Sequence, residues 1–338
     1  MRKLKVFAAV SLIISVLGLV GCSAGANKPS QSNQLAGVKL GYLPNITNAP
    51  AMVGLEKGLF QQDLGDIKLG TKQFPNGSLF MDALTTGQID IGFVGPEPAI
   101  NRYIQGGDVV VLSGVSNGGN LVVARKDSGV NSVKDLAGKT LATPARACTH
   151  DISIRILMQE QGLKMEDKGG NVKQVTQKPA DMVTLFQQKQ LDVAVVSEPW
   201  ASQLEAKQGA KVIVDWDKMP WEGKLPGTIL VASKKFVQEH PDVVKKVLKG
   251  NVDSVKYIQA NPNDAMELTT KHIAKLTKEE LPAEVVKKSF ARTQMTYEIK
   301  EDILAQMVNH SKEMGLVTGK TDVAGLVDLT LLNEVLKQ

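Results

Sequence analysis

The positions of hydrophobic residues divide the chain into three stretches with different periodicities. An uncharged apolar run covers residues 6–20, directly after three basic residues. From residue 38 to residue 232, short apolar runs typical of strands alternate with longer segments of helical periodicity. Residues 234–338 show helical periodicity alone, with an apolar face repeated along the segment. This order predicts an α/β fold with a mostly parallel sheet, followed by a helical C-terminal part.

Strands are expected wherever a short apolar run lies between turn residues. The runs of this kind are residues 38–42, 67–74, 89–94, 109–112, 121–124, 139–142, 172–175, 191–196, 211–214 and 227–232. A helix is expected from Pro50 to Gly58, because Pro favours the first helical position and Gly the position after the last. Ser78 is expected to cap a helix that ends at Gly87. Another helix is expected over residues 151–161.

The N-terminal apolar run has the parts of a secretory signal: a basic start, an apolar centre and small residues at its end. It is shorter than the roughly 20 apolar residues of a membrane-spanning helix, which disfavours a retained transmembrane anchor. Its ending, Leu-Val-Gly-Cys22, resembles the lipobox of bacterial lipoproteins. We therefore predict a signal peptide over residues 1–22, lipidation of Cys22 and a polar tether over residues 23–36. An ordinary signal with a coincidental cysteine is the alternative.

Charge and composition exclude several classes of protein. The net charge is +5, and residues 1–22 hold three positive charges and no acids, so the remaining chain is near +2, roughly neutral for its size. No basic stripe interleaved with aromatic residues is present, so no nucleic-acid partner is expected. If Cys22 is lipidated, Cys148 has no partner for an intrachain disulfide. The four histidines are scattered, so neither a metal site nor a cofactor is expected.

Chain length predicts more than one structural unit. About 316 residues remain after the signal, more than a single hydrophobic core usually serves. We expect residues 37–121 and 223–338 to form a discontinuous lobe I, and residues 122–222 to form lobe II. The chain then crosses between lobes near residues 119–123 and 222–228. Paired crossings of this kind act as a hinge around a cleft.

Unusual polar residues follow the predicted strands at the places where helices begin. They lie in residues 42–50, 75–78, 95–98, 143–151 and 197–200. Ligands of open α/β sheets bind at the carboxyl ends of strands. Helix starts there bind anions through oriented N–H groups and the helix dipole, without a formal positive charge. Each segment taken singly is an ordinary cap or turn, whereas five on one edge favour a ligand cleft.

Five stretches of the sequence match a known family in order and spacing. They are GYLPNITNAPAMVGLEKGLF, FPNGSLFMDALTTGQIDIGFVGPEPAI, VKDLAGKTLATPARACTHDISIRILMQEQGL, LDVAVVSEPWASQL and KLPGTILVASKKFVQEHPDVVKKVL. In these stretches the chain resembles the substrate-binding component of nitrate/sulfonate/taurine-type ABC importers. The resemblance covers nearly the whole chain after the signal. It implies a two-lobed type II periplasmic-binding-protein fold, a small anion in a central cleft, and delivery to a membrane permease with a cytoplasmic ATPase. Ligands of the family are alkanesulfonates, taurine, nitrate and bicarbonate, with vitamin precursors in more distant relatives.

The resemblance also implies a set of ligand contacts by position. They are Asn45, Asn48, Asn76, Gly77, Ser78, Pro96, Glu97, Gly119, Asn120, Thr143, Arg146, Thr149, Asp151, Glu198, Pro199, Trp200 and Thr228. Arg146 either binds an oxyanion or is a solvated surface residue. Trp200 either covers an organic tail or packs its helix. Glu97 and Glu198 either cap helices, hold a closed state or receive the amino group of a zwitterion such as taurine.

One segment departs from the family pattern: Cys148 and His150 lie where many relatives have a small, amide-rich sequence. The pair superficially suggests a nucleophile and a base. Residues two apart on a helix point about 200° apart, which disfavours a Cys/His hydrolase. A helix start lowers a thiol pKa, so a reactive but non-catalytic cysteine stays open. Nor does the sequence contain a Gly-x-Ser-x-Gly elbow or a phosphate-binding loop.

These observations predict a monomeric, lipid-anchored solute-binding protein that is not an enzyme. The expected ligand is an aliphatic sulfonate, with nitrate, taurine, bicarbonate or a vitamin precursor as alternatives. A secreted Cys/His enzyme and a ligand-sensing partner of a membrane receptor are the other classes that the sequence leaves open.

Overall fold

The computed structural model describes residues 35–318 and 322–337. The predicted signal peptide, Cys22 and the tether up to residue 34 lie outside these residues. In the described part of the chain, no helix is both long and apolar enough to span a bilayer.

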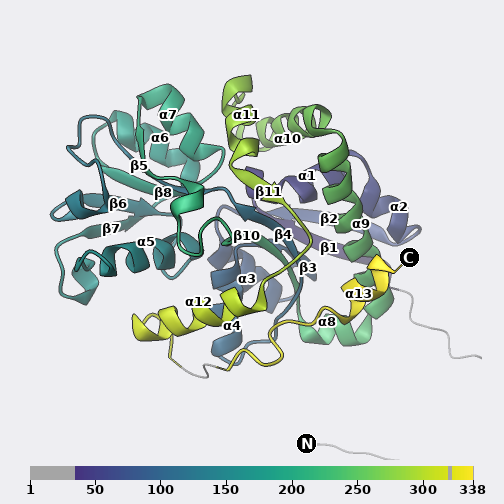
Figure 1. Ribbon diagram of the computed structural model, residues 1–338. Coiled ribbons are helices and arrows are strands. Elements are labelled where there is room, and N and C mark those ends of the chain that lie inside the picture. Colours follow the sequence, from purple (N-terminus) through teal and green to yellow (C-terminus); the bar gives the residue numbers. More distant parts are fainter. Residues whose placement is uncertain (1–34, 319–321, 338) are drawn as a thin grey trace, which may run out of the picture. The chain divides into compact units, whose positions relative to one another are not determined.

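The first of two sheets has six strands in the order β11-β4-β10-β3-β1-β2 (Figure 1). Its strands are β1 (Gly37–Tyr42), β2 (Lys68–Gln73), β3 (Ile91–Val94), β4 (Val110–Gly118), β10 (Pro226–Ala232) and β11 (Thr293–Met295). β1 pairs in parallel with β2 and β3. β10 pairs antiparallel with β3 and β4, and β11 antiparallel with β4.

The second sheet has five strands in the order β7-β6-β8-β5-β9. They are β5 (Asn120–Ala124), β6 (Thr140–Thr143), β7 (Lys173–Thr176), β8 (Val193–Ser197) and β9 (Lys211–Val214). β6 is parallel to β7 and β8, whereas β5 is antiparallel to β8 and β9. The prediction of a mostly parallel sheet is therefore wrong. Every antiparallel pair includes β4, β5 or β10, the strands by which the chain leaves one sheet or enters the other.

Helices surround both sheets. They are α1 (Ala49–Glu56), α2 (Leu59–Leu64), α3 (Gly77–Thr85), α4 (Pro96–Ile104), α5 (Thr149–Gln159), α6 (Pro179–Gln187), α7 (Trp200–Gln208), α8 (Lys234–Glu239), α9 (Pro241–Ala260), α10 (Pro262–Thr277), α11 (Ala283–Ala291), α12 (Glu301–Glu313) and α13 (Thr330–Leu336). The cap of α3 is Asn76 rather than Ser78, since Asn76 Oδ1 accepts a hydrogen bond from Leu79 N at 3.0 Å. The strand β11 interrupts the expected all-helical C-terminal part; three residues are too short to show a strand pattern.

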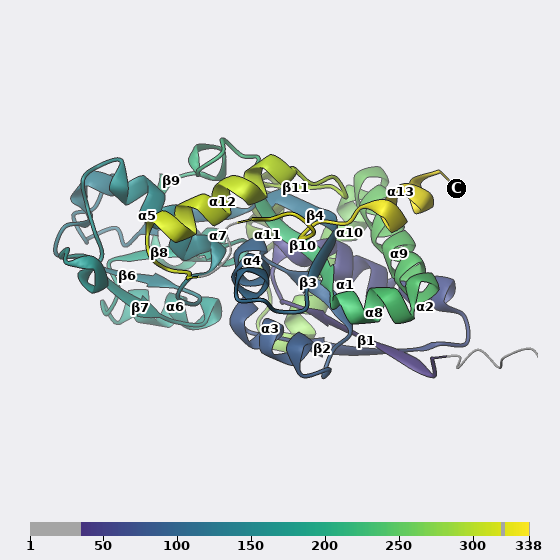
Figure 2. The ribbon, with the colours of Figure 1, turned by 90° about the horizontal axis from the view of Figure 1, so that it is seen from below.

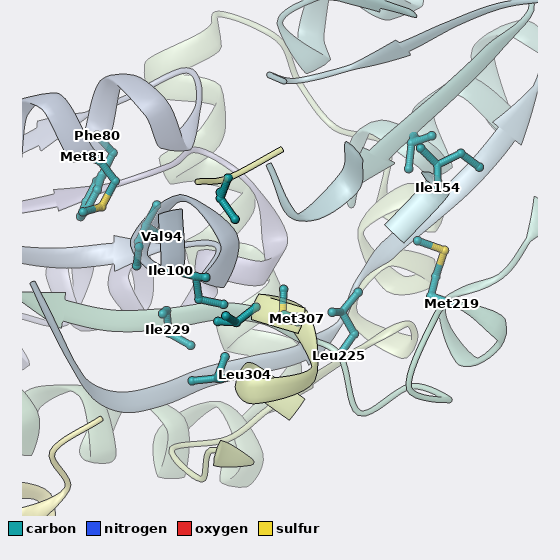
Figure 3. Close-up of a cluster of buried hydrophobic side chains, with 14 of the residues drawn as sticks. Phe80, Met81, Val94, Ile100, Ile154, Met219, Leu225, Ile229, Leu304 and Met307 are labelled. Carbon is teal, nitrogen blue, oxygen red and sulfur yellow. The ribbon is translucent and has the colours of Figure 1, made fainter. Parts of the chain in front are cut away.

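One large cluster of buried hydrophobic side chains extends over residues of both sheets (Figure 3). It includes Ile229 of the first sheet, Ile154 of α5, and Leu304 and Met307 of α12. Figures 1 and 2 both show α12 alongside α4 and α5, and α12 packs against both helices. Leu304 and Met307 are fully buried, and each such side chain contributes about 1.5–3 kcal/mol to folding. Helix α12 thus joins the helical layers of the two sheets.

The chain passes from the first sheet to the second at Gly118 and Gly119. Both have positive φ angles, 73° and 69°, which an L-residue adopts only with strain. A Cβ at residue 119 would also lie 2.6 Å from Thr47 Cγ2. Gly119 is therefore required by the crossing itself. That the crossings form a hinge between two lobes stays a prediction.

Candidate functional site

A pocket of about 140 Å³ lies between loops from the first and the second sheet. On the first-sheet side it is lined by Leu43, Pro44, Asn45, Thr47, Asn48, Gln73, Pro75, Asn76, Gly77, Gly95, Pro98, Gly227, Thr228 and Thr277. On the second-sheet side it is lined by Pro144, Cys148, Thr149, His150, Lys178, Pro179, Ala180, Ser197 and Trp200. Of the predicted contacts, the pocket brings together Asn45, Asn48, Asn76, Gly77, Thr149, Trp200 and Thr228.

The loop after β1 is held by hydrogen bonds among its own polar side chains. Asn48 Nδ2 donates to Asn45 Oδ1 at 2.7 Å and to Thr228 Oγ1 at 3.1 Å. Thr228 Oγ1 donates to Thr47 Oγ1 at 2.9 Å, and Thr47 Oγ1 donates to Asn45 Oδ1 at 2.9 Å. Asn48 Oδ1 accepts from Leu43 N at 3.2 Å. The side chains of Asn48 and Thr228 are therefore used to shape the pocket wall.

The first residue of α3, Gly77, packs closely against Pro98 in the first turn of α4. A Cβ at Gly77 would lie 2.5 Å from Pro98 Cγ, so only glycine fits there. The N–H groups in the first turn of a helix have no partner within the helix. Gly77 N donates no hydrogen bond to the residues that the structure describes, so this helix start offers a free donor to the pocket.

On the second-sheet side, hydrogen bonds link Cys148 to the crossing between the sheets. His150 Nε2 lies 2.8 Å from Ser197 Oγ, and Ser197 Oγ donates to Asn120 Oδ1 at 2.8 Å. Because the hydroxyl proton of Ser197 is used on Asn120, Ser197 accepts the Nε2 proton of His150. His150 Nδ1 is then an acceptor, and the thiol of Cys148 lies 3.8 Å from it.

The structure corrects two expectations about this pair. Cys148 and His150 do contact each other, because Cys148 is the N-cap of α5 with extended backbone and does not follow helical geometry. The thiol is not activated: burial raises the pKa of Cys148 to about 12. Burial also lowers the pKa of His150 to about 4, so the ring is neutral at pH 7. A neutral thiol beside a neutral imidazole is a poor nucleophile–base pair.

Three carboxylates expected near the ligand turn away from the pocket. Glu97 is fully buried on α4 and accepts a hydrogen bond from Ser311 of α12, and burial raises its pKa to about 8. Asp151 accepts from Arg155 Nε at 2.7 Å and from Ala147 N at 2.7 Å.

Glu198 is the third of these carboxylates. It caps α7 through Ser202 N at 3.0 Å and pairs with Arg292 at 3.0 Å. It is fully buried, and burial raises the pKa of its carboxyl. For Glu97 and Glu198, the structure therefore supports roles in packing and helix capping, and neither lines the pocket.

The other predicted contacts that lie outside the lining are Ser78, Pro96, Gly119, Asn120, Thr143, Arg146 and Pro199. Arg146 is 57% exposed and pairs with Asp167 at 2.9 Å, as expected of a solvated surface arginine. Thr143 Oγ1 accepts from Gln174 and donates to the carbonyl of Ala145. Trp200 is 3% exposed and packs in the core beneath α7, and it also lines the pocket. That it covers an organic tail stays a prediction.

Comparison with known proteins identifies the family. The sequence model of the NMT1-like family matches residues 31–274, more than half of the chain. The chain belongs to the NMT1-like family. A putative aliphatic sulfonates-binding protein of Bacillus subtilis (strain 168) is 26% identical over 339 residues, which cover 97% of this chain and 96% of that protein. The resemblance drawn from the sequence motifs is thus confirmed.

Solved structures of similar proteins confirm the fold class. The alkanesulfonate-binding protein SsuA from Xanthomonas axonopodis pv. citri, bound to MOPS, superposes with a TM-score of 0.74 at 19% identity, over 87% of this chain and 98% of that one. The nitrate-binding protein NrtA from Synechocystis PCC 6803 gives a TM-score of 0.76 at 16% identity, over 90% and 89%. These likenesses give this NMT1-like chain the α/β periplasmic-binding-protein fold.

Sequence analysis of this NMT1-like protein did not predict several residues that line the pocket. They are Gln73, Lys178, Pro179, Ala180 and Thr277. The rule of strand ends, applied to β7 as it was to its parallel neighbour β6, predicts residues 177–180 at the same edge. Thr277 comes from the end of α10, and nothing in its sequence surroundings indicates a pocket.

The lining of the pocket carries positive charge only. Lys178 is the only lining residue with a formal charge at pH 7, and no carboxylate is among them. Among the residues that the structure describes, no three His, Cys, Asp or Glu side chains gather as a metal site would require. The pocket therefore presents uncharged donors in its buried part and a single cation to any bound molecule.

Proposed function

We propose that this chain is the extracytoplasmic solute-binding component of an ABC importer, and that it captures a small organic anion, best an aliphatic sulfonate. The observation that carries the proposal is the pocket lining, which combines helix starts, hydroxyls and amides with one lysine and no carboxylate. The relatives named above bind sulfonates and nitrate according to their names.

The electrostatics of the pocket favour an anion. The starts of α3 and α5 contribute Gly77 and Thr149 to its lining, and helix N-termini attract negative charge through the helix dipole and their free N–H groups. His150 is neutral and gives its Nε2 proton to Ser197, so it adds neither charge nor repulsion. An oxyanion with three equivalent oxygens matches a wall of dispersed, uncharged donors.

The same lining disfavours a zwitterion such as taurine. A buried ammonium group requires a carboxylate or several free acceptors. Glu97 and Glu198 are committed to Ser311 and to Arg292, and Asn45 Oδ1 already accepts hydrogen bonds from Thr47 and Asn48. Trp200 and the prolines of the lining supply apolar surface for an organic tail, which favours an aliphatic sulfonate over nitrate or bicarbonate.

In the mechanism we propose, the ligand bridges loops of two lobes that close around it. Contacts already run between loops of the two sheets: Ile46 N donates to the carbonyl of Glu198 at 2.8 Å, and Glu97 N to Thr149 Oγ1 at 3.4 Å. The crossing at Gly118 and Gly119 supplies the hinge. The monomeric, closed protein, held to the membrane by lipid on Cys22, then docks on a permease whose cytoplasmic ATPase drives release.

The first test is thermal unfolding of the chain from Ser23 onward with a panel of alkanesulfonates, taurine, nitrate and bicarbonate. A ligand at 100 times its dissociation constant stabilises the fold by about 2.7 kcal/mol. Stabilisation by an alkanesulfonate supports the proposal. The double variant Thr149→Ala/Asn76→Ala should lose this stabilisation, whereas Ser78→Ala, outside the lining, should keep it. If no anion of the panel raises the melting temperature, the sulfonate assignment is wrong.

The anchor is tested separately by Cys22→Ser. Without the lipidated cysteine the protein should be released from the membrane fraction. A variant that stays in the membrane fraction contradicts the lipid anchor and leaves the ligand proposal untouched.

The enzyme alternative finds little support. The relative from Bacillus subtilis is named as a binding protein, and the Cys148 thiol is neutral and engaged with His150. A ligand recovered chemically unchanged after long incubation with the protein supports binding alone, and any product would favour the enzyme.

A further inference from the structure

Two residues of the pocket lining differ from all others by being exposed to solvent: Gln73 and Lys178. Gln73 is the last residue of β2, in the first sheet, and Lys178 directly precedes α6, on the second-sheet side. Every other lining residue is buried or half-buried. These two side chains therefore mark the mouth of the pocket from both sides.

Lys178 carries a charge that nothing in the surrounding protein uses. Its ammonium group makes neither a hydrogen bond nor an ion pair with residues 35–318 and 322–337, and the same holds for the side-chain amide of Gln73. Asp151 and Glu198, next to two of the pocket loops, are engaged elsewhere. Asp181 lies in the first turn of α6 and forms no ion pair with Lys178 in the described part of the chain. An amide and an ammonium group are thus available together at the mouth.

The buried end of the pocket already has uncharged donors for one anionic group, at Gly77 and Thr149. An exposed lysine in the lining is not needed to hold that group. We propose that the ligand is a short organic dianion, with one oxyanion group at the helix starts and a second negative group at the mouth, bound by Lys178 and Gln73. This inference rests on the proposed function and narrows its ligand class.

The proposal predicts an order of affinity that depends on the second group alone. Sulfoacetate carries a sulfonate and a carboxylate, propane-1-sulfonate replaces the carboxylate by an alkyl end, and taurine replaces it by an ammonium group. Sulfoacetate should bind about tenfold more tightly than propane-1-sulfonate, as one added charge-assisted contact allows. Taurine should bind most weakly, because its ammonium group meets Lys178.

The test is isothermal titration calorimetry with these three probes on the wild type, Lys178→Met, Lys178→Arg and Lys173→Met. Lys173 is an exposed lysine of β7 outside the pocket lining and serves as the matched control. Lys178→Met should reduce the preference for sulfoacetate over propane-1-sulfonate about five- to tenfold, and Lys178→Arg and Lys173→Met should retain it. Raising the salt to 0.5 M should shrink the wild-type preference, because an exposed pair is screened.

The outcomes separate this inference from the function on which it rests. Equal weakening of sulfoacetate and propane-1-sulfonate in Lys178→Met means that the lysine binds the first anionic group, and overturns the proposal. A wild type that binds propane-1-sulfonate as tightly as sulfoacetate also overturns it, while the sulfonate-binding function stands. If none of the probes binds any of the proteins, the sulfonate assignment on which this inference rests is wrong.

Discussion

On the first-sheet side of the pocket, the loop after β1 makes most of its side-chain hydrogen bonds between neighbours in sequence, whereas the hydrogen bonds on the second-sheet side join residues that are far apart. Asn45, Thr47 and Asn48 bond to one another within four residues, joined from outside by Thr228. On the second-sheet side, Asn120, His150 and Ser197 come from three separate segments. The conformation of the loop after β1 is therefore fixed largely by hydrogen bonds within the loop. The second-sheet side forms only after β5, β8 and α5 have assembled, so it depends on the packing of the whole sheet.

The largest change in the free energy of unfolding is expected from a substitution in the loop after β1. Asn48→Ala removes an acceptor for Leu43 N and donors to Asn45 and Thr228, all in a buried place. We expect the free energy of unfolding to fall by about 3 kcal/mol, measured by urea denaturation. Asn76→Ala, which removes one helix cap, should cost only about 1 kcal/mol. Equal losses in the two variants would contradict the network described for this loop.

A smaller change in the free energy of unfolding is expected from pH, and Glu97 and His150 contribute to it with opposite signs. The pKa of Glu97 is raised to about 8 from 4.5, so the stability it contributes is present at low pH and is lost as pH rises toward 8. The pKa of His150 is lowered to about 4 from 6.5, so its contribution is lost as pH falls below 6.5. Between pH 6.5 and 8 the titration of Glu97 therefore acts without that of His150.

Urea denaturation at pH 6.5 and pH 8 measures this difference. The wild type should lose up to about 2 kcal/mol over this range, at a slope of about 1.4 kcal/mol per pH unit for one proton. Glu97→Gln should lose clearly less. Parallel losses in both proteins would show that Glu97 is ionised throughout the range.

The smallest effect is expected from the chain of hydrogen bonds on the second-sheet side. Ser197→Ala leaves Asn120 Oδ1 and His150 Nε2 without their partner, which should cost about 1–2 kcal/mol in unfolding free energy. The freed imidazole no longer fixes Cys148, so the thiol should react several-fold faster with a maleimide at pH 8. Ser78→Ala, an exposed serine on α3, should change neither quantity. An unchanged thiol reactivity in Ser197→Ala would show that burial alone protects Cys148.

The contrast between the two sides also explains how much of the molecule the sequence predicts. Strand ends followed by helix starts were recognisable locally, and this rule placed Asn76, Gly77 and Thr149 in the pocket. The rule does not say which side of a helical turn faces the ligand. Glu97 and Asp151 lie in first turns of the expected helices, yet they point into the protein interior. Their direction is set by α12 and Arg155, which pack there in three dimensions.

The sequence does not predict features that are set by contacts with a distant part of the chain. β11 exists because Thr293–Met295 pairs with β4, more than 170 residues earlier in the sequence. The antiparallel placement of β5 and β10 follows from the chain leaving one sheet and returning to it. The contact between Cys148 and His150 follows from an extended N-cap, whereas the sequence argument assumed a helix at both positions.

The position of α12 has a consequence for the order in which the protein becomes complete. Its residues Leu304 and Met307 fill the core that the two sheets share, and they are encoded after every strand of both sheets. The strands of both sheets therefore precede, in the sequence, the helix that covers the apolar surface between them. Without residues 301–313, that surface would be open to water. A chain truncated before residue 301 would therefore contain every strand of both sheets and still expose this apolar surface to water.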